Sequence, residues 1–188
     1  MGLLGGLFGG GGGGDPAAKW VRDPSLKLDV DLDSASLAGI RLGSRAASLA
    51  PLGAPTNATP AKDGVYTWEP LGLEAFVTKG LIEAYSFSFD GPAPFPGAFL
   101  RGSTPVPLRS ATTQEELIRL LGQPWHRYAD PDFPEAPLQL FYETRALEWK
   151  LEILPSGTLG SLTLSAPPTL ANPETRKLCR VEKRWPPA

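Results

Sequence analysis

Residues 147–165 read Leu-Glu-Trp-Lys-Leu-Glu-Ile-Leu-Pro-Ser-Gly-Thr-Leu-Gly-Ser-Leu-Thr-Leu-Ser. Leu147, Trp149, Leu151 and Ile153 alternate with charged residues, and a similar alternation follows the Ser156-Gly157 turn. A period of two residues places one row of side chains on each face of a strand. A polar row opposite an apolar row is typical of an antiparallel sheet with one solvent-exposed face. The stretch therefore predicts two antiparallel strands joined by a Gly-containing turn.

The same strand pattern occurs upstream at 138–143, and again at 64–68, 73–77 and 81–89. Each set of strands follows a short segment with helix signals. In the second segment, Thr113 and Glu116 form a capping box, and Gly122 and Pro124 end the helix. A shift of 69 residues, from Gly53 to Gly122, also aligns Ser44 with Thr113 as N-cap residues and matches the prolines that follow each helix. The two segments, 37–90 and 105–165, are therefore expected to superpose.

The sequence thus predicts an α+β protein of two tandem units, each a short helix followed by about three antiparallel strands. A short C-terminal helix is expected after Asn172, the N-cap, with Pro173 at the first helical position and Leu178, Val181 and Trp185 packed on a sheet. The expected divisions are a flexible Gly-rich leader (1–19), the first unit (20–91), a Pro- and Gly-rich connection (92–104) and the second unit with the C-terminal helix (105–188). The residues expected in the core are Phe87, Leu121, Trp149, Leu151, Ile153, Leu162 and Leu164.

Composition excludes several classes of function. The chain of 188 residues contains one Cys and one His, so an internal disulfide, a thiolate cluster and a multi-imidazole metal site are excluded, and no cofactor is expected. The net charge of -2 does not favour nucleic-acid binding. No segment reaches the roughly 18 apolar residues of a membrane span. Without a recognisable secretion signal, a cytoplasmic location is expected, and the Ala-, Pro-, Leu- and Arg-rich composition suggests a bacterial source.

Two terminal segments each leave more than one interpretation open. Residues 1–14 are interpreted either as a flexible glycine tether or as a short apolar segment that docks on a partner or on a membrane face. The C-terminal residues 172–185 carry five Lys or Arg and two Glu. They are interpreted as a solvated helix face, as a docking site for an acidic partner or as a nucleic-acid-binding segment.

The densest cluster of polar and aromatic residues lies at 125–135. It is interpreted as a structural connection anchored by Trp125 and Phe133, as a protein-binding loop, or as a catalytic loop in which Asp130 or Asp132 orients His126 as a base. No Gly-x-Ser-x-Gly motif is present and Cys179 has no recognisable nucleophile context, so no catalytic residue is expected. Aromatic and Arg residues dominate protein-binding hot spots. The expected binding residues are therefore Trp125, Arg127, Tyr128, Asp130, Asp132 and Phe133.

A helix that ends in Leu-Gly-x-Pro, followed by strands with a Gly turn, resembles the BamE/SmpA-like lipoproteins. In tandem, this architecture resembles the beta-lactamase-inhibitor-protein fold, in which two helix-plus-sheet units grip a protein. The resemblance covers about 37–90 and 105–165, and it implies a fold and a non-catalytic mode of binding. The lipoproteins' signal and anchoring Cys are not matched, and no residue that would identify a target is carried over.

We therefore expect a non-catalytic bacterial protein-binding module, in an immunity or inhibitor-like role, with a protein partner that the sequence does not identify. The alternative is a small enzyme or ligand-binding protein with a pocket around His126.

Overall fold

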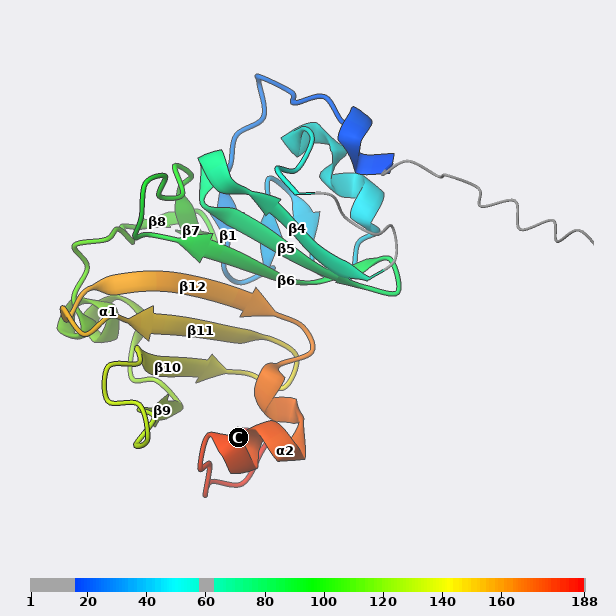
Figure 1. The fold of residues 1–188 in the computed structure, drawn as a ribbon. Helices are drawn as coiled ribbons and strands as arrows, with labels where there is room; N and C mark the ends of the chain where they lie inside the picture. Colours follow the sequence, from blue (N-terminus) through cyan, green and yellow to red (C-terminus); the bar gives the residue numbers. More distant parts are fainter. Residues whose placement is uncertain (1–15, 58–62, 188) are drawn as a thin grey trace, which may run out of the picture.

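The computed structural model describes residues 16–57 and 63–187, which form two β-sheets with a few short helices (Figure 1). The strands are β1 (Val30–Asp31), β2 (Ser36–Leu37), β3 (Ile40–Arg41), β4 (Gly64–Trp68), β5 (Leu73–Thr78), β6 (Leu81–Ser88), β7 (Phe99–Arg101), β8 (Thr104–Val106), β9 (His126–Tyr128), β10 (Leu138–Glu143), β11 (Glu148–Ile153) and β12 (Leu159–Ser165). The α-helices are α1 (Gln114–Leu121) and α2 (Pro173–Leu178), and the 3-10 helices are η1 (Pro16–Lys19), η2 (Ala46–Leu52), η3 (Glu69–Leu71) and η4 (Thr169–Ala171). The α+β class is confirmed. Residues 1–14, for which the sequence left more than one interpretation open, lie outside the described residues.

The larger sheet has seven strands in the order β4-β5-β6-β12-β11-β10-β9, and every neighbouring pair is antiparallel. The hairpin expected from residues 147–165 is confirmed as β11 and β12. The strands of the two predicted units do not form separate sheets, because β6 pairs directly with β12 and places Phe87 opposite Leu162. Figure 1 shows β4 and β9 at opposite ends of this continuous sheet.

The smaller sheet has five strands in the order β3-β2-β1-β7-β8, with β1 and β7 parallel. No sequence pattern predicted strands here, and β7 lies within the segment interpreted as a connection, 92–104. Phe99 of β7 packs edge-on against Phe87, with ring centroids 5.5 Å apart. The core therefore lies between the two sheets.

Six of the seven residues expected in the core are buried, and Trp149 is partly exposed. The opposite row of β11 differs from expectation too. Glu148 is 0% exposed, because the chain that follows β12 covers this end of the sheet and binds the carboxylate through Thr169 and Leu170. The face of β11 that carries Glu148, Lys150 and Glu152 is therefore buried at the Glu148 end and partly exposed further along the strand.

The helix before β4 is a 3-10 helix, whereas α1 is an α-helix. The N-cap of the 3-10 helix η2 is Arg45, which makes no side-chain hydrogen bond there, whereas the alignment predicts Ser44 as the N-cap. The expected capping box of Thr113 and Glu116 is present in α1. Pro51 lies inside η2, which lacks a capping side chain, and both features weaken an α-helix.

Gly53 and Gly122 end these two helices in nearly the same backbone conformation, with φ 86° and ψ 179° at Gly53 and φ 88° and ψ -171° at Gly122. Residues that carry a side chain rarely adopt this backbone conformation, so alanine would be strained at either position. At Gly53 an added Cβ would also lie 3.0 Å from the Cβ of Arg22, whereas at Gly122 it would meet nothing within 4 Å.

We expect Gly122→Ala to lower the free energy of unfolding by about 1–3 kcal/mol, the usual range for such strain. Gly53→Ala is expected to lower it further, because the Arg22 backbone must also move. Urea unfolding of both variants measures the difference. Equal or reversed losses would contradict the contribution of the Arg22 contact.

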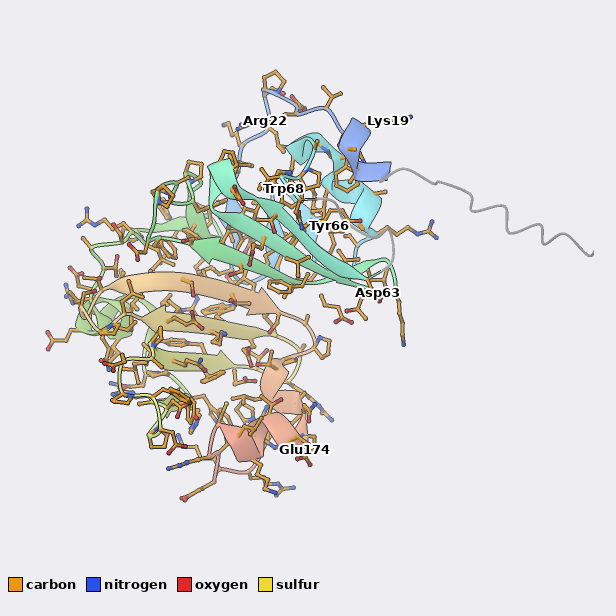
Figure 2. The ribbon with its side chains drawn as sticks, in the orientation of Figure 1. Lys19, Arg22, Asp63, Tyr66, Trp68 and Glu174 are labelled. Atoms are coloured by element: carbon orange, nitrogen blue, oxygen red, sulfur yellow. The ribbon has the colours of Figure 1, made fainter. Side chains whose placement is uncertain are left out.

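The two ends of the described chain both pack on the larger sheet. At the N-terminal end, Ala17 is buried and Trp20 stacks on Tyr66 of β4, with ring centroids 5.5 Å apart. Figure 2 shows Tyr66 and Trp68 beneath the segment that carries Lys19 and Arg22. Residues 16–19, placed in the leader by the sequence analysis, are therefore part of the fold.

At the C-terminal end, α2 begins as expected, with Asn172 as its N-cap and Pro173 at its first position. Leu178 was expected to pack on the sheet, but it is 73% exposed, and Cys179 is buried in its place. We name the residues around it the C-terminal cluster: Phe141, Leu170 and Cys179, with Trp125, Tyr128, Val181 and Trp185 packed against them. No helix in the described part of the chain is long and apolar enough to cross a membrane.

Candidate functional site

The predicted binding residues lie on an edge strand and on the connection that follows it. His126, Arg127 and Tyr128 form β9, which pairs with residues 139–141 of β10. Trp125 precedes this strand, and Asp130, Asp132 and Phe133 follow it in the connection 129–137. Because side chains alternate along a strand, the cluster is divided between the two faces of the sheet.

His126 and Tyr128 face the C-terminal cluster. The Nε2 atom of His126 lies 2.8 Å from the carbonyl oxygen of Cys179, and its ring contacts those of Phe141 and Trp125. A carbonyl oxygen only accepts hydrogen bonds, so Nε2 carries the hydrogen and donates it. This bond attaches the C-terminal segment to β9.

The connection after β9 contains a local turn and an exposed aromatic residue. The carboxylate of Asp130 accepts a hydrogen bond from the backbone N–H of Asp132 at 3.0 Å. Phe133, which one interpretation treated as an anchor, is 66% exposed. The side chain of Phe133 is therefore available to a partner and does not hold the loop in place.

A groove with a volume of about 300 Å³ lies at the edge of the sheet, beside the end of β10. We name it the aromatic groove. Its walls are formed by the end of α1 and the residues after it, by the ends of β10 and β11, and by one residue of β7. It is lined by Arg101, Leu121, Gln123, Trp125, Tyr142, Glu143, Thr144 and Trp149. Of the predicted binding residues, only Trp125 lines it.

Hydrogen bonds and ring contacts fix the aromatic walls of this groove. Tyr142 and Trp149 lie opposite each other on β10 and β11, with ring centroids 6.3 Å apart. The hydroxyl of Tyr142 donates to the carbonyl of Gly122 at 3.1 Å, and the indole of Trp149 donates to the carbonyl of Leu32 at 3.0 Å. Both bonds use the polar end of the ring and leave its apolar surface free for contact.

Cationic side chains border the groove. The guanidinium of Arg101 lies 5.5 Å from the ring of Trp149 and forms an exposed ion pair with Asp33 at 3.6 Å. Arg127 donates to the side chain of Gln123 at 2.8 Å, and Lys183 donates to the carbonyl of Trp125 while lying 5.8 Å from its ring. The rim is therefore positive, although the whole chain carries a net charge of -2.

Burial raises the pKa of Tyr142 to about 12, and the nearby Arg127 opposes part of this increase. The phenol therefore stays neutral at physiological pH and acts only through its ring and its hydrogen bond. Arg127 lies opposite Leu140 in the ladder, so its side chain is on the same face as Tyr142.

Within the part of the chain that the structure describes, no strand pairs with the edge of β10 beside the groove. β11 pairs with β10 along its whole length, but β9 pairs only with Gln139–Phe141. A longer β9 would place Pro124 opposite Glu143. Proline has no N–H to donate to a ladder, so pairing ends before it.

Two buried carboxyl groups lie side by side at the same end of the sheet, on the face that carries Phe141. Glu143 and Glu148 face each other across β10 and β11, and both are buried. Glu148 accepts hydrogen bonds from the hydroxyls of Thr169 and Ser165 and from the N–H of Leu170. Glu143 accepts one hydrogen bond from the indole of Trp185 at 3.3 Å. Apart from its contact with Glu148, no described residue forms a hydrogen bond with the other carboxyl oxygen of Glu143, which is buried.

The pKa of Glu143 is raised to about 9, first by burial and then by the hydrogen bond and negative charge of Glu148. The indole of Trp185 opposes part of this increase. Two adjacent buried carboxylates repel each other, so the pair holds one proton at neutral pH. The described residues contain no group of three His, Cys, Asp or Glu side chains that could hold a metal ion.

Sequence reasoning missed Arg101, Tyr142 and Trp149 as site residues. Tyr142 and Trp149 belong to the apolar rows of their strands, and membership of such a row predicts a buried core position. Their pairing at the end of a hairpin was the only sign that they share a surface.

No protein-family model and no curated protein matches the chain. Among solved structures, the chain is similar to the crystal structure of a DUF4309 family protein, YjgB, from Bacillus subtilis subsp. subtilis strain 168. The two sequences are 18% identical, the match covers 69% of this chain and 84% of that chain, and the TM-score is 0.48.

This finding contradicts the resemblance to the BamE/SmpA-like lipoproteins and to the beta-lactamase-inhibitor-protein fold, which was wrong. The motifs behind it were short local patterns that any helix followed by a β-meander produces. They did not predict the five-stranded sheet formed by β1–β3, β7 and β8.

Proposed function

We propose that the protein is a non-catalytic protein-binding module and that the aromatic groove is the centre of its contact surface. The observation that carries this proposal is the grouping of Trp125, Tyr142 and Trp149 with Arg101 around one groove. Trp, Tyr and Arg are the residues most enriched in binding hot spots.

The rigidity of the groove supports the same proposal. The polar ends of Tyr142 and Trp149 are bound to backbone carbonyls, so little side-chain entropy is lost when a partner binds. The favourable free energy of a partner's contacts with the groove is therefore offset less by the ordering of these two side chains.

The connection after β9 extends this proposed surface. Phe133 offers an exposed aromatic ring, and Asp130, Asp132 and Arg127 offer charged side chains nearby in the chain. Tyr128 packs on the C-terminal cluster, so its proposed contribution is to hold the connection in place.

Three further expectations remain part of the proposal: a bacterial source, a cytoplasmic location, and an origin of the two helix-plus-strand segments by duplication. The last is supported by the matching conformations of Gly53 and Gly122. It is also supported by the isolated bridges that join Arg45 to Leu81 and Thr113 to Thr158. The immunity or inhibitor-like role is not proposed, since it rested on the contradicted resemblance.

The proposal assigns His126 no catalytic role, because its Nε2–H is bound to a backbone carbonyl within the C-terminal cluster. A base in that position would have only Nδ1 left to accept a proton.

The test uses the full chain as bait in a lysate, followed by affinity measurement with the purified partner. We expect Trp125→Ala to weaken binding by about 10-fold or more, a hot-spot loss above 1 kcal/mol. Val21→Ala is the control, because Val21 is 82% exposed but lies in the N-terminal segment. Equal affinity of Trp125→Ala and the control for the partner would contradict the proposed surface.

A further inference from the structure

We propose that the aromatic groove binds an extended, acidic segment of the partner protein, which adds a strand to the free edge of β10. This inference rests on the proposed function and specifies the chemistry of the occupant.

The backbone of β10 offers hydrogen bonds toward the groove. Thr144 donates its N–H to Leu147 in the turn between β10 and β11, so its backbone faces β11. Backbone groups alternate in direction along a strand, so those of Tyr142 also face β11 and those of Glu143 face the opposite, free edge. A partner strand laid along that edge would bind the N–H and C=O of Glu143.

The edge is kept free by the local sequence. Pro124, which would stand opposite Glu143, has no N–H to donate, and Leu121 and Gln123 line the groove and do not pair with β10. Addition of a strand is a common mode of peptide recognition, in which the backbone supplies affinity and side-chain pockets supply specificity. A helical occupant would have no free backbone groups to offer this edge.

The charges at the rim favour an acidic segment. Arg101, Arg127 and Lys183 border the groove, and the exposed Arg145 directly follows Thr144 in the chain. Among the described residues, Asp33 is the one acidic side chain that forms an ion pair with these cations, through an exposed contact with Arg101. Glu143 holds a proton at neutral pH and does not offset the positive rim.

The size of the groove limits the segment to a short one. A volume of about 300 Å³ is at the lower end of ligand sites and accommodates one or two side chains. We therefore expect an apolar side chain against Trp149 and a carboxylate against Arg101 or Arg127, with the neighbouring residues extended along β10.

The experiment selects peptides of about nine residues from a random display library on the full chain and measures their affinity by fluorescence anisotropy. We expect the selected peptides to be enriched in Asp and Glu. Arg101→Gln and Arg127→Gln should each weaken binding about 5- to 20-fold, and the loss should shrink in about 1 M salt, where charges are screened beyond about 3 Å. Arg22→Gln, at the other end of the sheet, should bind as the wild type does.

A second arm tests the added strand without altering the protein. Only Glu143 offers free backbone groups at this edge, so N-methylation of the selected peptide should weaken binding at the single position whose amide meets the Glu143 carbonyl and should be tolerated at the two neighbouring positions. Thermal melts of the arginine variants check that they remain folded.

Selection of neutral or basic peptides, no selection at all, or unchanged affinity in both arginine variants would overturn the inference. Uniform tolerance of N-methylation would also overturn it. Neutral peptides that still lose affinity in Trp125→Ala would leave the proposed function standing, with a different occupant. Affinity unchanged by Trp125→Ala for both peptide and partner would overturn the proposed function as well.

Discussion

Phe87→Ala is expected to lower the free energy of unfolding by about 3–5 kcal/mol, the usual cost of removing a large buried aromatic side chain. Phe87 lies on β6, which pairs with β12 and so joins the two halves of the larger sheet, and it is fully buried. Its ring meets Phe95 at 4.7 Å and Phe99 at 5.5 Å between centroids, both edge-on. The variant therefore leaves a cavity where the two sheets meet. Urea unfolding with an unchanged m-value measures the loss.

Phe133→Ala is the matched control, since it removes the same side chain from an exposed position. It is expected to change stability by no more than about 0.5 kcal/mol. If the two variants differed by less than about 1 kcal/mol, the position of the core between the sheets would be wrong.

The burial of Phe87 could be predicted from the sequence, because long strands show their period. β6, β11 and β12 each have six or more residues, and their apolar residues alternate with polar ones. A row of this length also fixes which face is buried, because shifting it by one residue would turn the whole row to solvent.

The five-stranded sheet could not be predicted in the same way. β1, β2 and β3 have two residues each, so no period can be read from them. The sheet depends on the parallel pairing of Val30 with Phe99, which are far apart in the chain. Such pairings leave no local pattern.

The aromatic groove was missed for a related reason. Trp149 belongs to the apolar row of β11, and the row predicts core for every member. Whether the end of this row is covered depends on residues far away in the chain, and here Leu32 and Arg101 contact Trp149 without burying it. The exposure of Trp149 is therefore set by neighbours that the strand's own residues do not reveal.

Glu148 shows the opposite error. Its place in the polar row predicted exposure, but the chain after β12 folds back over this end of the sheet and buries the carboxylate. Burial of a charged group requires hydrogen-bond donors, and here Ser165, Thr169 and Leu170 supply them. Glu143, directly opposite, lacks such a set.

Glu143→Gln is accordingly expected to stabilise the protein above about pH 5. The folded-state pKa of Glu143, about 9, is higher than the ordinary value of 4.5, so the folded protein holds a proton that the unfolded chain releases. Wild-type stability therefore falls as the pH rises from about 4.5 to 9. Glutamine keeps the shape of the protonated acid without titrating. The gain is expected to be about 2–4 kcal/mol at about pH 8, allowing for partial hydration of the pair, and to vanish near pH 4.

Glu152→Gln provides the control with the opposite sign. Burial disfavours ionisation of Glu152, but Lys150 and the hydroxyl of Ser161 outweigh it and hold the pKa of Glu152 below its usual value. Its contribution to stability is therefore present at neutral pH and lost in acid, so its replacement should lower stability at pH 8. Urea unfolding of both variants between pH 4 and 9 separates the two effects. If the free energy of unfolding of Glu143→Gln varied with pH in parallel with that of the wild type, Glu143 would be ionised in the folded protein and the pair would not hold a proton.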